Sequence, residues 1–250
     1  MNYIRTGNGP TLVLIHGFLS GYSYWSEQIE YLKKHFDVIA MDLLGYGDST
    51  EKTGLDSISD FADYVIEILD VLNVGDFHLI GHSMGGMIAQ EVALKVNHRV
   101  QRLVLYGTGP VGNLPGRFEP LEVSQEKVKH QGTKEAATYS VKSWYLQETA
   151  DPNYQPSLEL AQKVSTQTYI NGLKAMKSWS STDRLDQILA QTLIVWGNKD
   201  RTYVWEQPYA LWRGIKDAEI AVLPQCAHNI HMEKSELFNM IVSDFLIEHY

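Results

Sequence analysis

Residues 77–86 of the chain read FHLIGHSMGG. Four apolar or aromatic positions lead directly into a Gly-x-Ser-x-Gly pattern centred on Ser83, and an amphipathic stretch over residues 89–96 follows. The pentapeptide alone arises too easily by chance to be informative, so its setting has to decide. A strand running into the pattern and a helix running out of it predict a sharp turn that exposes the serine hydroxyl. Such a strained turn needs small neighbours, which Gly81 and Gly85 supply.

Other short apolar runs lie on both sides of this segment. They are continuous rather than alternating, which is typical of strands buried on both faces of a parallel sheet. The expected strands are Thr11–Ile15, Phe36–Met41, Phe77–Ile80, Val100–Tyr106, Thr192–Trp196 and Glu219–Leu223. Helical spacing of apolar residues separates them, for example over residues 58–72 and 235–247. This alternation predicts an α/β fold with a mostly parallel central sheet flanked by helices.

The alternation of strands and helices stops after Gly109 and resumes near Leu185. The residues between have no convincing strand, and we expect helices over residues 134–147, 157–170 and 172–179. We therefore predict a helical lid inserted into the sheet domain. The predicted division is an α/β core of residues 1–109 and 186–250 and a lid of residues 110–185.

Composition narrows the expected partners. The chain has 250 residues with a formal net charge of −9, which disfavours nucleic acid and anionic membrane surfaces. One cysteine, Cys226, allows no internal disulfide, and no apolar stretch approaches the roughly 20 residues of a membrane-spanning helix. The N-terminal residues do not resemble a signal peptide. We expect a cytoplasmic protein that acts on a small molecule, and the oligomeric state is left open.

Several separated segments together resemble the α/β-hydrolase family over nearly the whole chain. They are His16-Gly17-Phe18, Asp42–Ser49, Gly81–Gly86, Gly197–Asp200 and His228. The resemblance implies a catalytic triad in the chain order serine, acid, histidine. Serine at the turn, where the dehalogenase and epoxide-hydrolase branches have aspartate, places the chain among the serine hydrolases of the family.

A serine hydroxyl needs a base within hydrogen-bond reach, and the base needs an orienting acid. His228 follows the last predicted strand and precedes the C-terminal helix, where the family places its base. His231 is the nearby alternative. Asp200 follows the strand Thr192–Trp196 in the family's Gly-x-x-Asp pattern, and Asp42 and Asp48 are less favoured alternatives. The predicted triad is therefore Ser83, Asp200 and His228.

The resemblance also implies an oxyanion hole formed by the backbone N–H groups of Phe18 and Met84. His16 is expected to shape the loop that carries Phe18, and His82 is expected to have a packing or hydrogen-bonding role. No histidine or cysteine cluster has zinc-like spacing, and Gly45-Tyr46-Gly47 lacks the lysine of a phosphate loop. We predict neither a metal nor a cofactor.

These features predict a serine hydrolase that cleaves a carboxylic ester or related acyl compound through an acyl-enzyme. One alternative is hydrolysis of a carbon–carbon bond in ring-fission diketones, or of an enol-lactone; the ring-fission enzymes often carry an aromatic residue after the base, where this chain has Asn229. A perhydrolase, a small-molecule receptor that retains the triad and a purely structural relative are further alternatives. Candidates for the substrate-binding wall are Trp25, Trp144, Tyr145 and Trp179.

Overall fold

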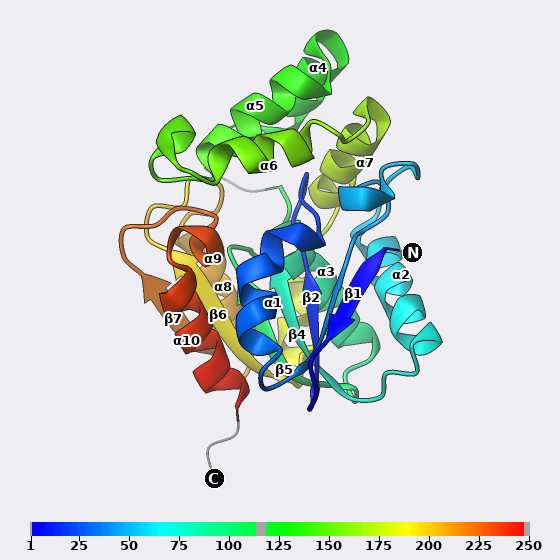
Figure 1. The fold of residues 1–250 in the computed structure, drawn as a ribbon, viewed down its shortest axis with the longest axis vertical. Helices are drawn as coiled ribbons and strands as arrows, with labels where there is room; N and C mark the ends of the chain where they lie inside the picture. The colour runs from blue at the N-terminus through cyan, green and yellow to red at the C-terminus, as the bar shows by residue number, and fades with distance from the viewer. Residues whose placement is uncertain (1, 114–118, 248–250) are drawn as a thin grey trace.

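A seven-stranded sheet forms the centre of the computed structural model, which describes residues 2–113 and 119–247 (Figure 1). The strand order is β1-β3-β2-β4-β5-β6-β7, and every neighbouring pair is parallel except β1 with β3. The predicted fold class is thus confirmed. The strands are β1 Tyr3–Thr6, β2 Thr11–Ile15, β3 Asp37–Met41, β4 Phe77–His82, β5 Val100–Tyr106, β6 Gln191–Gly197 and β7 Glu219–Leu223.

The edge strand β1 was not expected from the sequence. Its residues alternate between exposed and half-buried, so it has no continuous apolar run. Tyr3 pairs with Met41 and Thr6 with Val38 in antiparallel register. A short edge strand of this kind is fixed by its pairing with β3 rather than by burial of its own side chains.

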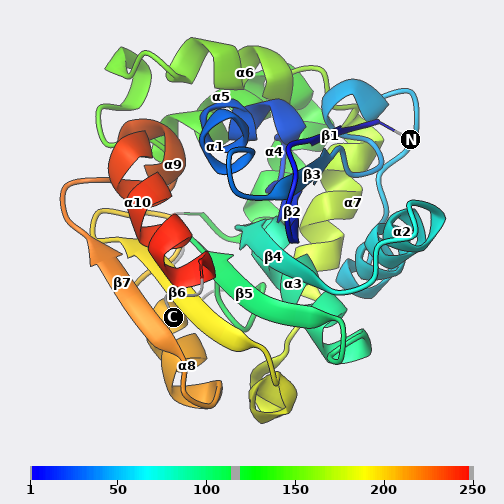
Figure 2. The ribbon, with the colours of Figure 1, turned by 60° about the horizontal axis from the view of Figure 1, so that its bottom comes forward.

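Helices cover both faces of the sheet, as Figure 2 shows. Along β2, Leu12 and Leu14 belong to one buried apolar cluster, whereas Val13 and Ile15 belong to the other, as the alternation of a strand requires. The first cluster includes residues of α1 and α10, and the second includes residues of α2, α3 and α8. The helices of the core are α1 Ser26–Leu32, α2 Ile58–Val71, α3 Met84–Lys95, α8 Glu206–Gly214, α9 Ile230–Glu233 and α10 Ser235–Leu246.

The helical insertion lies between β5 and β6 and covers one end of the sheet (Figure 1). Its helices are α4 Leu121–Gln131, α5 Thr133–Ser143, α6 Tyr154–Ala161 and α7 Thr166–Lys177. The inserted lid is therefore confirmed as a feature of the fold. The exact core and lid boundaries stay predictions, and residues 1, 114–118 and 248–250 of those ranges lie outside the described residues.

The lid helices differ from the expected ranges. The expected helix over residues 157–170 is two helices, because α6 ends at Ala161 and a new helix begins after Ser165, whose hydroxyl accepts the Thr168 N–H. Helix α7 then runs through Gly172, where we expected a separate helix to start. Helix α4 was missed because its exposed and polar residues give only a weak apolar face. No helix in the described ranges is long and apolar enough to cross a membrane.

Two short paired segments, residues 110–112 and 179–181, join the lid to the core, and we name them the stalk. Val111 and Ser180 form an isolated antiparallel bridge. Beside it, the Gly112 N–H donates to the Trp179 carbonyl and the Ser181 N–H donates to the Pro110 carbonyl, at 3.1 and 2.8 Å. The chain therefore leaves the core for the lid and returns to it at one place.

Candidate active site

The loops that follow β2, β4, β6 and β7 meet at one end of the sheet. Parallel register brings Ile15 beside Gly81 and Gly197 beside Leu223, so these strands finish at the same edge. Ligands of open α/β sheets bind at the carboxyl ends of the strands. The predicted oxyanion loop, nucleophile, acid and base follow β2, β4, β6 and β7 in that order, and the lid lies above them.

Ser83 occupies the turn between β4 and α3 with φ 56° and ψ −119°. A positive φ is uncommon for a residue with a side chain and marks backbone strain, which the surrounding structure has to hold in place. Two contacts do so. The Ser83 N–H donates to the Tyr106 carbonyl at 3.0 Å, and the Thr108 hydroxyl donates to the Ser83 carbonyl at 2.8 Å.

The glycines around Ser83 allow close approach of backbone segments. A Cβ atom at Gly85 would lie 2.4 Å from the carbonyl oxygens of both Ile15 and His16. A Cβ atom at Gly81 would lie 2.4 Å from the Gly85 carbonyl oxygen. A larger residue at Gly85 forces the turn away from β2, and a larger residue at Gly81 forces α3 away from β4, which explains physically why the Gly-x-Ser-x-Gly pattern is needed here.

The predicted base and acid are in direct contact. The Nδ1 atom of His228 lies 2.9 Å from Oδ2 of Asp200, and their side chains are 3% and 0% exposed. The other carboxylate oxygen of Asp200 accepts the N–H groups of Thr202 and Tyr203 at 2.7 and 3.1 Å. The carboxylate is therefore fixed in orientation, and because Nδ1 faces it, Nε2 is the imidazole nitrogen that the predicted role as base requires.

Ser83 and His228 line the same small cavity, whose volume is about 10 Å³. That volume holds roughly one water molecule. The lining combines histidine with aromatic and small residues and includes no lysine, arginine, aspartate or glutamate. The lining residues are Gly17, Phe18, Ser20, His82, Ser83, Trp144 and His228. Of the four predicted wall residues, Trp144 is the one in this lining.

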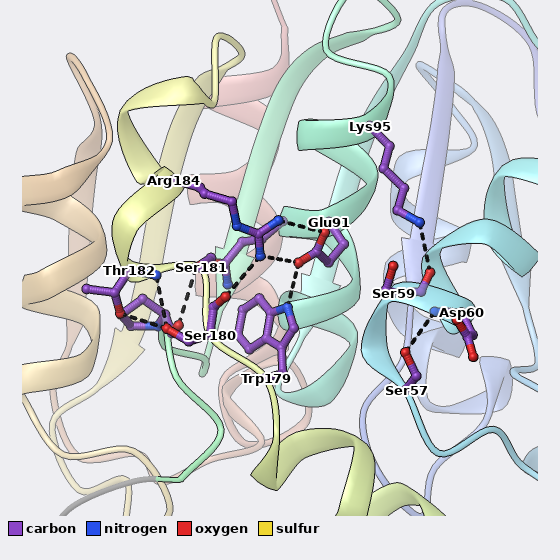
Figure 3. Close-up of polar contacts among 12 residues, drawn as sticks. Ser57, Ser59, Asp60, Glu91, Lys95, Trp179, Ser180, Ser181, Thr182 and Arg184 are labelled. Carbon is purple, nitrogen blue, oxygen red and sulfur yellow. Dashed lines mark hydrogen bonds and ion pairs between the residues drawn. The ribbon is translucent and has the colours of Figure 1, made fainter.

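The other three predicted wall residues lie outside the lining of this cavity. Trp25 is fully buried in the cluster beneath α1 and α10, with its ring 4.8 Å from that of His231. The Tyr145 hydroxyl lies 2.5 Å from the Ser157 hydroxyl within the lid. Trp179 donates its indole N–H to Glu91 on α3 at 2.8 Å, beside the Glu91–Arg184 ion pair (Figure 3). The size and aromatic character of these residues predict that they are buried, but not whether they pack against the cavity or elsewhere.

The loop after β2 runs beside the nucleophile. A Cβ atom at Gly17 would lie 3.0 Å from Cβ of Ser83. His16 fixes this loop, because its Nε2 accepts the Leu43 N–H at 3.0 Å and its Nδ1 therefore donates to the Gly17 carbonyl at 2.7 Å. Burial lowers the pKa of His16 to about 4, so this imidazole is neutral. Its expected role in shaping the loop agrees with these contacts.

The predicted oxyanion-hole residues flank Ser83 on two loops. Phe18 follows Gly17 and lines the cavity. Met84 is the first residue of α3, and the first N–H groups of a helix have no partner within the helix. That these two N–H groups receive the developing negative charge stays a prediction.

Three buried side chains, those of His82, Tyr106 and His231, lie close to the His228 carbonyl. Tyr106 donates its hydroxyl hydrogen to the His228 carbonyl at 2.7 Å, and His82 donates from Nε2 to the same carbonyl at 3.3 Å. His231 contacts the Tyr106 hydroxyl through Nδ1 at 3.0 Å and is outside the cavity lining. Burial lowers the pKa of His231 to about 3 and that of His82 well below its usual value. Tyr106 was missed from the sequence, where it is one apolar position of a strand.

Residues 10–235 match the family described as alpha/beta hydrolase fold, and the chain belongs to this family. A Pseudomonas putida 2-hydroxy-6-oxononadienedioate/2-hydroxy-6-oxononatrienedioate hydrolase is 31% identical, with 98% of this chain and 91% of the relative covered. A Comamonas testosteroni 2-hydroxy-6-oxo-6-phenylhexa-2,4-dienoate hydrolase is 28% identical, with coverage of 98% and 91%.

Solved structures agree in fold. The enol-lactonase of Burkholderia xenovorans LB400 superposes with a TM-score of 0.90 at 24% identity, covering 99% of this chain and 96% of that one. A thermophilic esterase of Thermogutta terrifontis has a TM-score of 0.89 at 25% identity, covering 98% and 92%. The chain is thus a hydrolase of the α/β fold. Among its described residues, no group of three histidine, cysteine, aspartate or glutamate side chains is arranged to hold a metal ion.

Proposed function

We propose that this chain is a serine hydrolase in which Ser83 attacks a carbonyl carbon, His228 is the general base and Asp200 orients it. The observation that carries the proposal is the His228–Asp200 contact of 2.9 Å, beside a cavity that His228 shares with the strained Ser83. Nucleophile, base and orienting acid in this arrangement are what a neutral hydroxyl needs to become reactive.

The proposed cycle has two stages. The Ser83 oxygen forms a bond to the substrate carbonyl carbon while its proton moves to Nε2 of His228, and the N–H groups of Phe18 and Met84 stabilise the oxyanion. His228 then protonates the leaving group as the scissile bond breaks, which leaves an acyl-enzyme. In the second stage His228 takes a proton from water and the hydroxide adds to the acyl carbon. The bond between that carbon and the Ser83 oxygen then breaks, the protonated imidazole returns its proton to Ser83, and the acyl group leaves as a carboxylic acid.

We favour a carboxylic ester or lactone with a small uncharged acyl group as substrate. The cavity beside Ser83 is lined by aromatic, histidine and small residues, without lysine or arginine. Burying a carboxylate there without a cationic partner is costly. Trp144 and Phe18 restrict the space that the acyl group enters.

The second candidate is hydrolysis of a carbon–carbon bond next to a ketone, and the comparisons favour it more directly than the ester. The relatives of 31% and 28% identity carry names of such hydrolases and cover 98% of this chain. The substrates in these names are carboxylates. Such a substrate needs a positively charged partner, and the cavity lining contains no lysine or arginine. The same serine and histidine serve both candidates, with a carbon leaving group protonated in place of an alcohol.

One comparative assay tests the proposal. Wild-type protein is given p-nitrophenyl acetate, an enol-lactone and a ring-fission dienoate at equal concentrations, and a fluorophosphonate probe reports a reactive serine. Ser83→Ala should abolish both turnover and labelling, while Ser178→Ala, at an exposed lid position, should leave both unchanged. Near-normal activity of Ser83→Ala contradicts the nucleophile assignment. A single slow turnover on every substrate favours a receptor over an enzyme.

A further inference from the structure

A short lid segment contacts the catalytic loop directly. We name residues Trp144–Leu146, which follow α5, the lid linker. The carbonyl oxygen of Trp144 accepts hydrogen bonds from the N–H groups of both His228 and Asn229, at 3.0 and 3.1 Å. Trp144 meanwhile lines the cavity next to Ser83, and its ring centroid lies 6.4 Å from that of His228. One residue of the lid linker therefore contributes both a wall of the site and an anchor for the base.

Glu233 at the end of α9 extends this connection. One oxygen of its carboxylate accepts the N–H of Leu146 at 2.6 Å, and the other accepts the N–H of Ala227 at 2.6 Å. Leu146 belongs to the lid linker, and Ala227 immediately precedes His228. A single side chain thus joins the lid to the loop of the base through two charge-assisted hydrogen bonds, the stronger kind of hydrogen bond.

The loop of the acid is tied to the same segment. Arg201, the residue after Asp200, donates to the carbonyl oxygens of Tyr145 and Leu146 at 3.2 and 3.3 Å. On the side of the acid, the lid linker is therefore held through the carbonyl groups of Tyr145 and Leu146. On the side of the base, it is held through the Trp144 carbonyl and the Leu146 N–H. The half-buried Glu233 forms no ion pair within the described part of the chain, so backbone N–H groups are its principal partners.

We propose that Glu233 is a positioning residue that keeps the base His228 and the wall residue Trp144 in a fixed mutual arrangement. This inference rests on the proposed function. Its physical reason is that neither the lid linker nor the loop of residues 224–229 lies within a helix or strand. Displacement of a reacting group by about 1 Å can lower a rate about a hundredfold, so the bridge is expected to affect catalysis and acyl selectivity together.

Two variants of Glu233 distinguish the length of its side chain, which lets it reach both N–H groups, from the charge of its carboxylate. Glu233→Gln retains the length of the side chain but replaces one accepting oxygen with an amide that repels the facing N–H. Glu233→Asp retains the charge but is too short to reach both N–H groups. Both should lower kcat for p-nitrophenyl acetate about ten- to a hundredfold. Both should also lower the acetate-to-hexanoate ratio of kcat/KM by about threefold or more, because Trp144 is no longer held against the base.

The matched control is Glu236→Gln. Glu236 lies in the first turn of α10, three positions after Glu233, is exposed and takes part in none of the hydrogen bonds between the lid linker and the loops of the acid and the base. We expect wild-type kcat and selectivity from it. Amide hydrogen exchange at Leu146 and Ala227 gives a readout independent of activity, and Glu233→Gln should accelerate exchange at both.

The outcomes are distinct. Wild-type kcat and selectivity in a folded Glu233→Gln or Glu233→Asp protein overturn the inference, as does a lower kcat with an unchanged acetate-to-hexanoate ratio. If the glutamine variant does not fold, the aspartate variant decides by the same measurements. Absence of Ser83-dependent turnover in the wild type instead overturns the proposed function, and hydrogen exchange then still tests whether Glu233 holds the two segments together.

Discussion

His228 and Asp200 face one another through Nδ1 and Oδ2 at 2.9 Å, in a position where neither side chain reaches bulk solvent. Replacing Asp200 with asparagine keeps the shape but presents an amide that can donate to Nδ1. The imidazole then carries its proton on Nε2, where it cannot act as a base toward Ser83. We expect kcat for p-nitrophenyl acetate to fall by about 10³- to 10⁴-fold. The exposed Asp186→Asn variant is the control, and an Asp200→Asn rate within threefold of wild type contradicts the assignment.

Trp144 sets the size of the acyl group in our proposal. Trp144→Ala removes the indole from the cavity wall but keeps the backbone carbonyl that anchors His228 and Asn229. We expect the hexanoate-to-acetate ratio of kcat/KM to rise about tenfold or more, because each methylene group that a pocket accepts is worth about 1–3 kcal/mol. Trp205→Ala, at a tryptophan 40% exposed on the core surface, should leave the ratio unchanged. An unchanged ratio for Trp144→Ala shows that the acyl group lies elsewhere.

Trp179 stabilises the fold without touching the cavity. Its indole N–H donates to the buried carboxylate of Glu91, which Arg184 also contacts (Figure 3). Trp179→Phe removes that donor, and we expect the free energy of unfolding in urea to fall by about 1–3 kcal/mol. Ester turnover well below the unfolding transition should stay within twofold of wild type. A large rise in KM instead returns Trp179 to the substrate-binding wall, and Trp205→Phe controls for the loss of indole surface.

His231 makes stability depend on pH. Its pKa is about 3 because of burial, against 6.5 for an ordinary histidine, so between these pH values the unfolded chain binds a proton that the folded chain does not. The free energy of unfolding therefore decreases as the pH falls through this window, by up to about 1.4 kcal/mol per pH unit from this residue. In His231→Gln the free energy of unfolding should therefore fall less steeply between pH 6 and pH 4, by about 1.4 kcal/mol per pH unit less than in the wild type. The exposed His98→Gln should retain the wild-type slope, and equal slopes in both variants contradict the prediction.

The local pattern of apolar and polar residues was sufficient to predict much of the fold. Continuous apolar runs located β2 to β7, because strands buried on both faces need such runs wherever they lie. The resemblance to the family implied the order Ser83, Asp200, His228, and the parallel register brings the loops that carry these residues to one edge of the sheet. Strand β1 escaped detection because its partner β3, rather than its own composition, fixes it.

Contacts between segments that are distant in the chain could not be predicted from the sequence. Trp25 and Trp144 are both aromatic residues near predicted site loops, yet Trp25 packs into the cluster under α10 and Trp144 reaches the cavity. Glu233 has no motif of its own, because it binds the backbone of Leu146, 87 positions away, and any residue presents the same N–H group there. Only the folded arrangement distinguishes such a carboxylate from an ordinary one near a helix end.

The stalk at Val111 and Ser180 makes the chain enter and leave the lid at one place, since the outgoing and returning segments pair with one another beside the core. Segments whose ends lie close together are the ones that proteins exchange, lengthen or lose with least damage to the remaining domain. Descendants of this chain can therefore acquire a differently shaped lid by recombination at these two positions while they inherit the strand order and the nucleophile turn intact. A new lid still has to supply a carbonyl group that anchors the N–H of His228 and an N–H group that Glu233 binds.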